Sequence, residues 1–146
     1  MPDLLNRASP ETDVLTGGQP DAADLVKLGK SGFRQVIDLR QDAETPDFDE
    51  AKAARDAGLS YASLPIAGAA GLTRENVQAF DRLLADAQRP VLVHCASGNR
   101  VGAMAALRAA WIEGHSPEDA IAIGKRWGLK ALEPTVRALL EAPPPR

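Results

Sequence analysis

The stretch RPVLVHCASGNRVGAM, residues 89–104, decides the fold of this chain. A turn residue and an apolar run of strand length lead into a short loop of small and polar residues, and an alanine-rich helical pattern follows at once. This order predicts a strand, a loop and a helix. Cys95, the only cysteine of the chain, ends the strand, so we expect its sulfur to face the loop near the N-terminus of the helix.

The loop after Cys95 has the composition of an anion-binding cradle. Its backbone N–H groups can turn inward, and the helix that begins near Arg100 adds unpaired N–H groups and the positive end of its dipole. A thiolate is itself an anion, so the same groups favour the ionised, nucleophilic form of Cys95. Gly98 permits a positive φ, and Arg100 offers a planar fork of donors for an oxyanion. The predicted anion-binding loop is Ala96, Ser97, Gly98, Asn99 and Arg100.

A structural role for Cys95 is the competing interpretation. A buried cysteine at the end of a strand commonly packs as a small hydrophobe, and a glycine in such a loop commonly serves only the turn. The conjunction of His94, Cys95, Gly98 and Arg100 between an apolar strand and a helix start favours a reactive cysteine.

The composition favours one domain in a reducing compartment. Hydrophobic residues make up 45% of the 146 residues but aromatic residues only 4%, so the core must consist mainly of aliphatic side chains. A net charge of -3 argues against a nucleic-acid surface and against electrostatic binding to acidic membranes. A single cysteine excludes an intramolecular disulfide, and the first residues lack the apolar segment of a signal peptide. We therefore expect a cytoplasmic protein without nucleic-acid or membrane partners.

Hydrophobic periodicity alternates between strands and helices along the chain. Strands are expected at residues 14–16, 33–40, 59–66 and 91–95, and Asp21, Thr73 and Ser116 are expected to cap helices. Connections of this length between strands predict an α/β fold with a mostly parallel sheet of about four strands flanked by helices. We expect a flexible N-terminal arm over residues 1–12, a single domain over 13–142 and a Pro-rich tail over 143–146.

Asp38 and Arg40 end the expected strand at residues 33–40, with Glu44 in the loop beyond. Charged residues at the carboxyl end of a strand in an α/β sheet lie where ligands usually bind. An Arg40–Glu44 ion pair that only fixes the loop would produce the same pattern. The sequence leaves these alternatives open.

No group of residues has the spacing of metal ligands, and His115 has no ligand-type partner near it. The glycines at 17–18 and 124–128 lack the wider pattern of a nucleotide-binding loop. We therefore predict neither a metal ion nor a cofactor.

Four motifs along the chain carry a family resemblance. They are TGGQP at residues 16–20, VIDLR at 36–40 with Glu44, Tyr61–Pro65, and VLVHC at 91–95 with Gly98 and Arg100. Together they resemble the cysteine-based protein tyrosine phosphatase superfamily, most closely the phosphatase-like domain found alone or fused in beta-lactamase hydrolase-like proteins. The resemblance implies a protein tyrosine or dual-specificity phosphatase-like fold. It also implies that Cys95 is the nucleophile, that Arg100 and the loop amides bind the oxyanion, and that His94 orients the loop.

The chain departs from this family in three ways. Four residues instead of the common five separate Cys95 from Arg100, so the cradle is one amide smaller. The loop at residues 67–72, where related phosphatases carry the aspartic acid that protonates the leaving oxygen, has no acid. Val101 stands where a hydroxyl residue usually stabilises the departing cysteine. Both half-reactions of phosphate ester hydrolysis are predicted to be weakened.

The short Cys-x-x-Gly-x-Arg loop also resembles that of rhodanese-like sulfurtransferases, which carry a persulfide on the cysteine. That reaction needs a thiolate and a compact ring of N–H groups, but no general acid. Sulfane-sulfur transfer through a Cys95 persulfide is therefore our first expectation, and phosphomonoester hydrolysis through a cysteinyl-phosphate is the alternative. A third reading is an inactive anion-binding module. The expected partner is accordingly a small oxyanion, a sulfane-sulfur donor or a phosphorylated substrate, with Asp38 and Arg40 as supporting residues.

Overall fold

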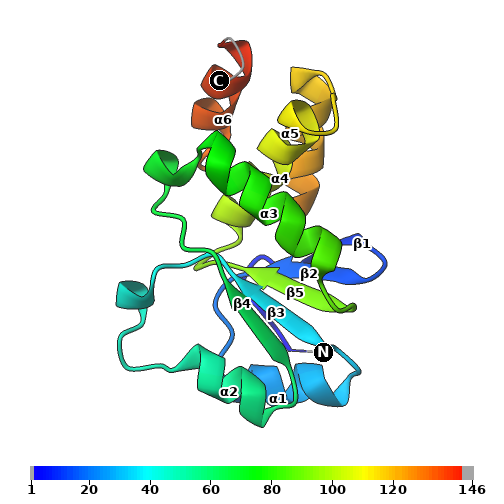
Figure 1. Cartoon of the computed structure of the whole chain (residues 1–146), viewed down its shortest axis with the longest axis vertical. Coiled ribbons are helices and arrows are strands. Elements are labelled where there is room, and N and C mark those ends of the chain that lie inside the picture. Colours follow the sequence, from blue (N-terminus) through cyan, green and yellow to red (C-terminus); the bar gives the residue numbers. More distant parts are fainter. Residues whose placement is uncertain (1, 143–146) are drawn as a thin grey trace.

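The computed structural model describes residues 2–142, and the expected Pro-rich tail at 143–146 lies outside the described residues. A five-stranded sheet in the order β1-β2-β5-β3-β4 forms the centre of the molecule (Figure 1). β2, β5, β3 and β4 run parallel, and β1 pairs antiparallel with β2. The predicted α/β fold with a mostly parallel sheet is confirmed; the sheet has one strand more than expected and is mixed. The strands are β1 (Ala8–Glu11), β2 (Val14–Gly17), β3 (Gln35–Asp38), β4 (Ser60–Ser63) and β5 (Val91–His94).

The prediction of a loosely held arm over residues 1–12 is wrong for most of that segment. Ala8–Glu11 pair with β2 as the edge strand β1, and Leu4 is buried in the core. Alternate residues of β1 are exposed, so only half of its surface is apolar enough to pack. The strand depends on the neighbouring β2 for its hydrogen bonds.

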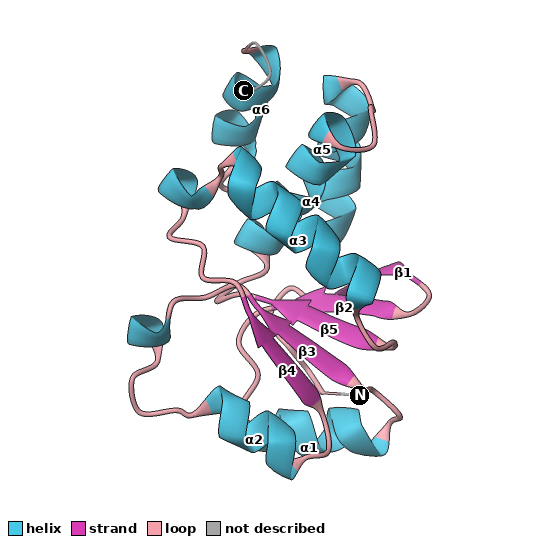
Figure 2. Ribbon diagram, viewed as in Figure 1, coloured by secondary structure: helices cyan, strands magenta, loops and turns pink. Residues whose placement is uncertain are grey.

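Helices cover both faces of the sheet (Figure 2). α1 and α2 lie on one face, where Leu15, Val36 and Leu92 point into a small core. α3 to α6 lie on the other face, over a larger core that includes Ile37 and Val93. The helices are α1 (Ala22–Lys30), α2 (Glu50–Asp56), α3 (Arg74–Asp86), α4 (Asn99–Trp111), α5 (Pro117–Trp127) and α6 (Glu133–Glu141), with short 3-10 turns η1 (Asp42–Glu44) and η2 (Ala69–Gly71).

Three helices begin as the sequence predicts. The side chains of Asp21, Thr73 and Ser116 each accept a hydrogen bond from the backbone N–H three residues further on. These caps satisfy N–H groups that have no partner within the helix. The starts of these three helices are therefore fixed by local hydrogen bonds.

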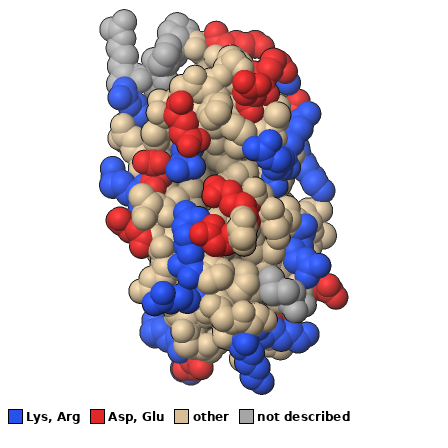
Figure 3. All heavy atoms as spheres, turned by 90° about the vertical axis from the view of Figure 1, so that its right-hand side faces the viewer, with Lys and Arg blue, Asp and Glu red and all other residues tan. Residues whose placement is uncertain are grey.

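The side of the molecule shown in Figure 3 carries acidic and basic side chains interspersed with one another. Among residues 2–142, none of the helices combines the length and the hydropathy that crossing a bilayer requires.

Candidate active site

Cys95 lies at the carboxyl end of the central strand β5, between β2 and β3, and is fully buried. The residues after it turn through Gly98, whose φ of 90° places it in the left-handed region and makes it the N-cap of α4. The Gly98 N–H donates a 3.1 Å hydrogen bond to the Cys95 Sγ. A backbone donor at the start of a helix thus points at the sulfur, as the sequence predicts.

The carbonyl groups of the loop point away from the cradle. The Ala96 carbonyl accepts from the Gln19 N–H at 3.2 Å, and the Ser97 carbonyl accepts from the Asn6 Nδ2 at 2.9 Å. In a trans peptide the N–H points opposite to the carbonyl, so the N–H groups of Ser97 and Gly98 are directed inward. The N-terminal segment therefore helps to orient the cradle, a role that its sequence does not indicate.

The Asn99 side chain connects the cysteine loop to the segment between α5 and α6. Its Oδ1 accepts hydrogen bonds from the backbone N–H groups of Lys130 and Leu132, at 2.9 and 3.2 Å. The Asn99 side chain is thus used for support, which leaves only its backbone for an anion.

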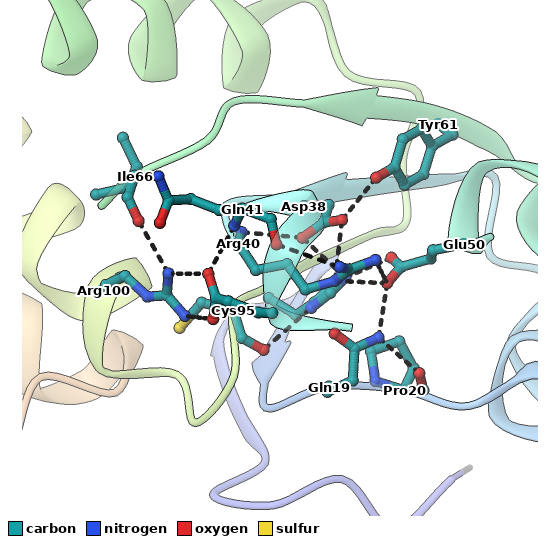
Figure 4. A network of polar contacts seen from close by, with 12 residues as sticks. Gln19, Pro20, Asp38, Arg40, Gln41, Glu50, Tyr61, Ile66, Cys95 and Arg100 are labelled. Atoms are coloured by element: carbon teal, nitrogen blue, oxygen red, sulfur yellow. Dashed lines mark hydrogen bonds and ion pairs between the residues drawn. The ribbon is translucent and has the colours of Figure 1, made fainter. Parts of the chain in front are cut away.

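Arg100 lies near Cys95 at one end of the polar network in Figure 4. It does not stand free but is paired with Glu44 from η1. Its two terminal nitrogens donate to the two Glu44 carboxylate oxygens at 2.7 and 2.6 Å, and Nη1 also donates to the Ile66 carbonyl at 2.9 Å. The hydrogen bond from Arg100 holds the pKa of Glu44 below its ordinary value. The same contact, followed by the influence of Cys95, raises the pKa of Arg100. A carboxylate thus occupies the edge of the guanidinium that its two terminal nitrogens form, one of the edges through which arginine can bind an oxyanion.

His94, which precedes the cysteine, is held between two acceptors. Its Nδ1 faces the Cys95 carbonyl at 3.1 Å, and its Nε2 faces the Glu50 Oε2 at 2.5 Å and an Asp38 oxygen at 3.7 Å. Burial alone would raise the pKa of Glu50, but the hydrogen bond with His94 and the donors around the carboxylate lower that pKa overall. The two contacts of the ring fix the His94 side chain between Glu50 and the Cys95 carbonyl.

Asp38 and Arg40 belong to the same buried network and do not face the cradle directly. The Arg40 guanidinium pairs with Asp38 and with Glu50, both at 3.3 Å. The Tyr61 hydroxyl donates to Asp38 at 2.6 Å. Burial raises the pKa of Asp38 despite the attraction of His94, and burial followed by the hydrogen bond to Asp38 raises the pKa of Tyr61.

The alternative of an Arg40–Glu44 ion pair is wrong in its partner. Glu44 pairs with Arg100, whereas Arg40 pairs with Asp38 and with Glu50 at the start of α2. Sequence reasoning missed Glu50, because it opens a short polar helix whose pattern gives no sign that one carboxylate is buried. Gln19, which donates to Glu50 at 2.7 Å, was visible only as part of a glycine turn.

Asp38, Glu50 and His94 bring three metal-ligand atoms within 4.8 Å of one another. These atoms already bond to one another and to Arg40, whose guanidinium pairs with both carboxylates. A divalent ion would have to displace these contacts and would add uncompensated positive charge. The donor set fits a hydrogen-bonded ion cluster better than a metal site.

The loop that usually supplies the general acid has none here. Residues 67–72 contain η2, and the Gly71 carbonyl in this loop accepts a hydrogen bond from the Asn76 side chain at 2.8 Å. A pocket of about 530 Å³ opens instead on the other side of η1, between that turn, α2 and β4. Ala43, Thr45, Phe48 and Tyr61 are among its lining residues.

A parallel sheet that ends in a His-Cys loop, with a backbone donor on the sulfur and an arginine at the start of the next helix, defines the class of Cys-based phosphatase-type enzymes. Residues 3–128 match the family model described as a DSP-PTPase phosphatase fused to NAD+ kinase, and the chain belongs to this family. The predicted relation to the phosphatase superfamily is confirmed.

Curated relatives agree with this assignment. The chain is 37% identical over 116 residues to the beta-lactamase hydrolase-like protein of Xylella fastidiosa strain Temecula1, a match that covers 76% of this chain and 26% of that protein. The chain therefore matches about a quarter of the length of that relative.

Solved structures share the fold. The nma1982 protein of Neisseria meningitidis superposes with a TM-score of 0.77 at 23% identity, covering 92% of this chain and 95% of that one. TpbA of P. aeruginosa, solved in complex with phosphotyrosine, gives a TM-score of 0.70 at 21% identity, with 94% and 84% covered.

Proposed function

We propose that this chain hydrolyses phosphomonoesters through a cysteinyl-phosphate on Cys95. The observation that carries the proposal is the 3.1 Å hydrogen bond from the Gly98 N–H to the Cys95 Sγ, at the start of a helix that also presents Arg100. Such an arrangement supplies both a nucleophile and donors for an oxyanion. The binding of phosphotyrosine by TpbA, which has the same fold, supports a phosphorylated substrate for this chain as well.

In the first step the Cys95 thiolate attacks phosphorus, the ester P–O bond breaks, and the leaving oxygen takes a proton. The inward N–H groups of the loop and the Arg100 guanidinium hold the other phosphoryl oxygens while attack and departure stay in line. In the second step water attacks phosphorus, the S–P bond breaks, and orthophosphate leaves with the thiolate restored. His94 keeps the Cys95 peptide in place through its 3.1 Å contact to the carbonyl.

Sulfane-sulfur transfer is the second candidate, because the loop has only four residues between Cys95 and Arg100 and residues 67–72 carry no acid. Here the thiolate attacks the outer sulfur of a donor such as thiosulfate, the S–S bond of the donor breaks, and sulfite leaves. The Cys95 persulfide then passes its outer sulfur to a nucleophilic acceptor. A smaller ring of amides suits one terminal sulfur better than three phosphoryl oxygens.

One pair of measurements separates these candidates. Release of orthophosphate from phosphotyrosine and para-nitrophenyl phosphate, lost in Cys95→Ser and lowered at least about 100-fold in Arg100→Ala, would support hydrolysis. Inactivity towards both esters, with gain of one sulfur atom on wild-type protein after thiosulfate and its removal by cyanide, would replace hydrolysis by sulfur transfer. If neither reaction occurs while Cys95→Ser still binds phosphate, the chain is an anion-binding module.

The unpaired thiol would have to stay reduced for either reaction. This requirement supports placement of the protein in the cytoplasm.

A further inference from the structure

The leaving oxygen of a phosphate ester needs a proton, and the loop at residues 67–72 has no group to give it. Among the carboxylates of the described residues, Glu44 is the one that contacts Arg100, through both of its oxygens. It therefore lies at the edge of the proposed anion cradle, although it comes from a turn 56 residues earlier in the chain. Its side chain remains 29% exposed, so it can move without breaking the core.

We propose that Glu44 is the general acid of this enzyme and that substrate binding switches it into that role. The inference rests on the proposed phosphomonoester hydrolysis. In the structure Glu44 occupies the Nη1–Nη2 edge of Arg100, and Cys95 is fully buried. In the proposed switch a phosphoryl group takes over this edge of Arg100 and displaces the carboxylate, which then faces the phosphoryl oxygens instead of a guanidinium.

The exchange of partners reverses the electrostatics of Glu44. The charged groups that face it are Arg100 on α4 and Arg40 after β3, and both favour the carboxylate form. A bound phosphoryl group takes up Arg100 and places negative charge beside Glu44, so the protonated form becomes favoured. Glu44 then takes a proton from solvent or from the monoanionic ester, and gives it to the leaving oxygen as the P–O bond breaks. In the second step the carboxylate takes a proton from the attacking water.

The surroundings of Glu44 suit this role. Its neighbours Ala43 and Thr45 line the pocket of about 530 Å³, together with Phe48 and Tyr61. The turn η1 thus has one side toward Arg100 and another toward this pocket. The open space beside η1 leaves room for the turn to shift when Arg100 takes up a phosphoryl group.

The test compares two substrates whose leaving groups differ in their need for a proton. In Glu44→Gln we expect kcat for phenyl phosphate to fall about 100-fold or more, while kcat for para-nitrophenyl phosphate, whose leaving group departs without a proton, falls less than tenfold. The fall of kcat at high pH, which reports the acid, should disappear in the variant. Asp47→Asn, in the same loop and exposed, should behave as wild type.

Inhibition by inorganic phosphate tests the displacement. Removal of the competing carboxylate charge should make phosphate bind several-fold more tightly to Glu44→Gln than to wild type. An equal loss on both substrates, an unchanged pH profile or unchanged phosphate affinity would each overturn the role of Glu44 while leaving hydrolysis in place. A wild-type protein that hydrolyses neither ester would instead overturn the proposed hydrolysis and this role with it.

Discussion

The Glu50 Oε2 on α2 lies 2.5 Å from the His94 Nε2 at the end of β5, and both side chains are buried. The other nitrogen of the same ring faces the Cys95 carbonyl at 3.1 Å. A helix on one side of the sheet is thereby connected, through a single imidazole ring, to the backbone carbonyl of the proposed nucleophile. We infer that Glu50 is a positioning residue for the cysteine loop.

Glu50→Gln should slow the reaction of Cys95 with iodoacetamide at neutral pH. The amide keeps the shape and a hydrogen bond but removes the negative charge that faces the His94 Nε2 and fixes the ring against the Cys95 carbonyl. A hydrogen bond to a charged group contributes about 1.5–3 kcal/mol, so we expect the alkylation rate constant to fall about tenfold. Glu75→Gln, on the exposed side of α3, is the matched control. An unchanged alkylation rate alongside reduced stability would mean that Glu50 only supports the fold.

The two buried carboxylates should make opposite contributions to acid stability. The pKa of Glu50 is lowered from 4.5, so the unfolded chain binds its proton more readily and the stabilisation is lost as the pH falls below about 4.5. The pKa of Asp38 is raised from 3.8, so its folded form holds the proton to higher pH and stability falls as the pH rises past about 4.

Urea unfolding between about pH 3 and pH 7 checks this pair of signs, since midpoints report the free energy of unfolding. Glu50→Gln should flatten the loss of stability on the acid side. Asp38→Asn should steepen it, because the opposing contribution is gone. The same dependence of the free energy of unfolding on pH in both variants would contradict these opposite contributions of Glu50 and Asp38.

Close packing of α4 against the end of α5 should make Gly102 intolerant of a side chain. A Cβ at this position would overlap the backbone of Leu129. Overpacking of this kind typically costs about 1–3 kcal/mol, and backbone atoms cannot yield as a side chain can. We expect Gly102→Ala to lower the melting temperature by roughly 6–12 °C, as about 3 kcal/mol does in a chain of this size.

Gly32→Ala is the comparison for Gly102→Ala. At position 32 nothing lies within 4 Å of a new Cβ, but φ is 94°. Only the left-handed backbone penalty of about 1–2 kcal/mol applies there. An equal fall of the melting temperature in Gly32→Ala and Gly102→Ala would show that the structure relieves the overlap with Leu129.

The sequence predicted the elements whose signals are local. The apolar run before Cys95, the glycine after it and the caps at Asp21 and Ser116 each act within a few residues, and the structure has the strand, loop and helices that they predict. The strand at Ala8–Glu11 was not predicted, because an edge strand with alternating exposure has too little apolar surface to be recognised without its partner β2.

The long-range contacts of the site could not be predicted in the same way. The Glu44–Arg100 and Glu50–His94 pairs join residues 56 and 44 positions apart. Each pair depends on the path that the chain takes between β3 and α2. The charge of Glu44 was visible in the sequence, but the choice between Arg40 and Arg100 as its partner is a matter of tertiary placement.

Val101→Thr should accelerate the second half of the proposed hydrolysis. Val101 is fully buried in the first turn of α4, directly after Arg100, at the position where the resemblance to phosphatases implies a hydroxyl group. Threonine keeps the shape of valine and adds one donor that can stabilise the sulfur as the S–P bond breaks. We expect kcat for para-nitrophenyl phosphate to rise several-fold and the burst of nitrophenol to shrink, because the cysteinyl-phosphate decays faster.

The buried hydroxyl should lower the free energy of unfolding by about 1–3 kcal/mol if it lacks a partner. Val101→Ala, which adds no donor, separates chemistry from packing, and a Val101→Thr variant with unchanged kcat and burst would show that the hydroxyl does not reach the sulfur.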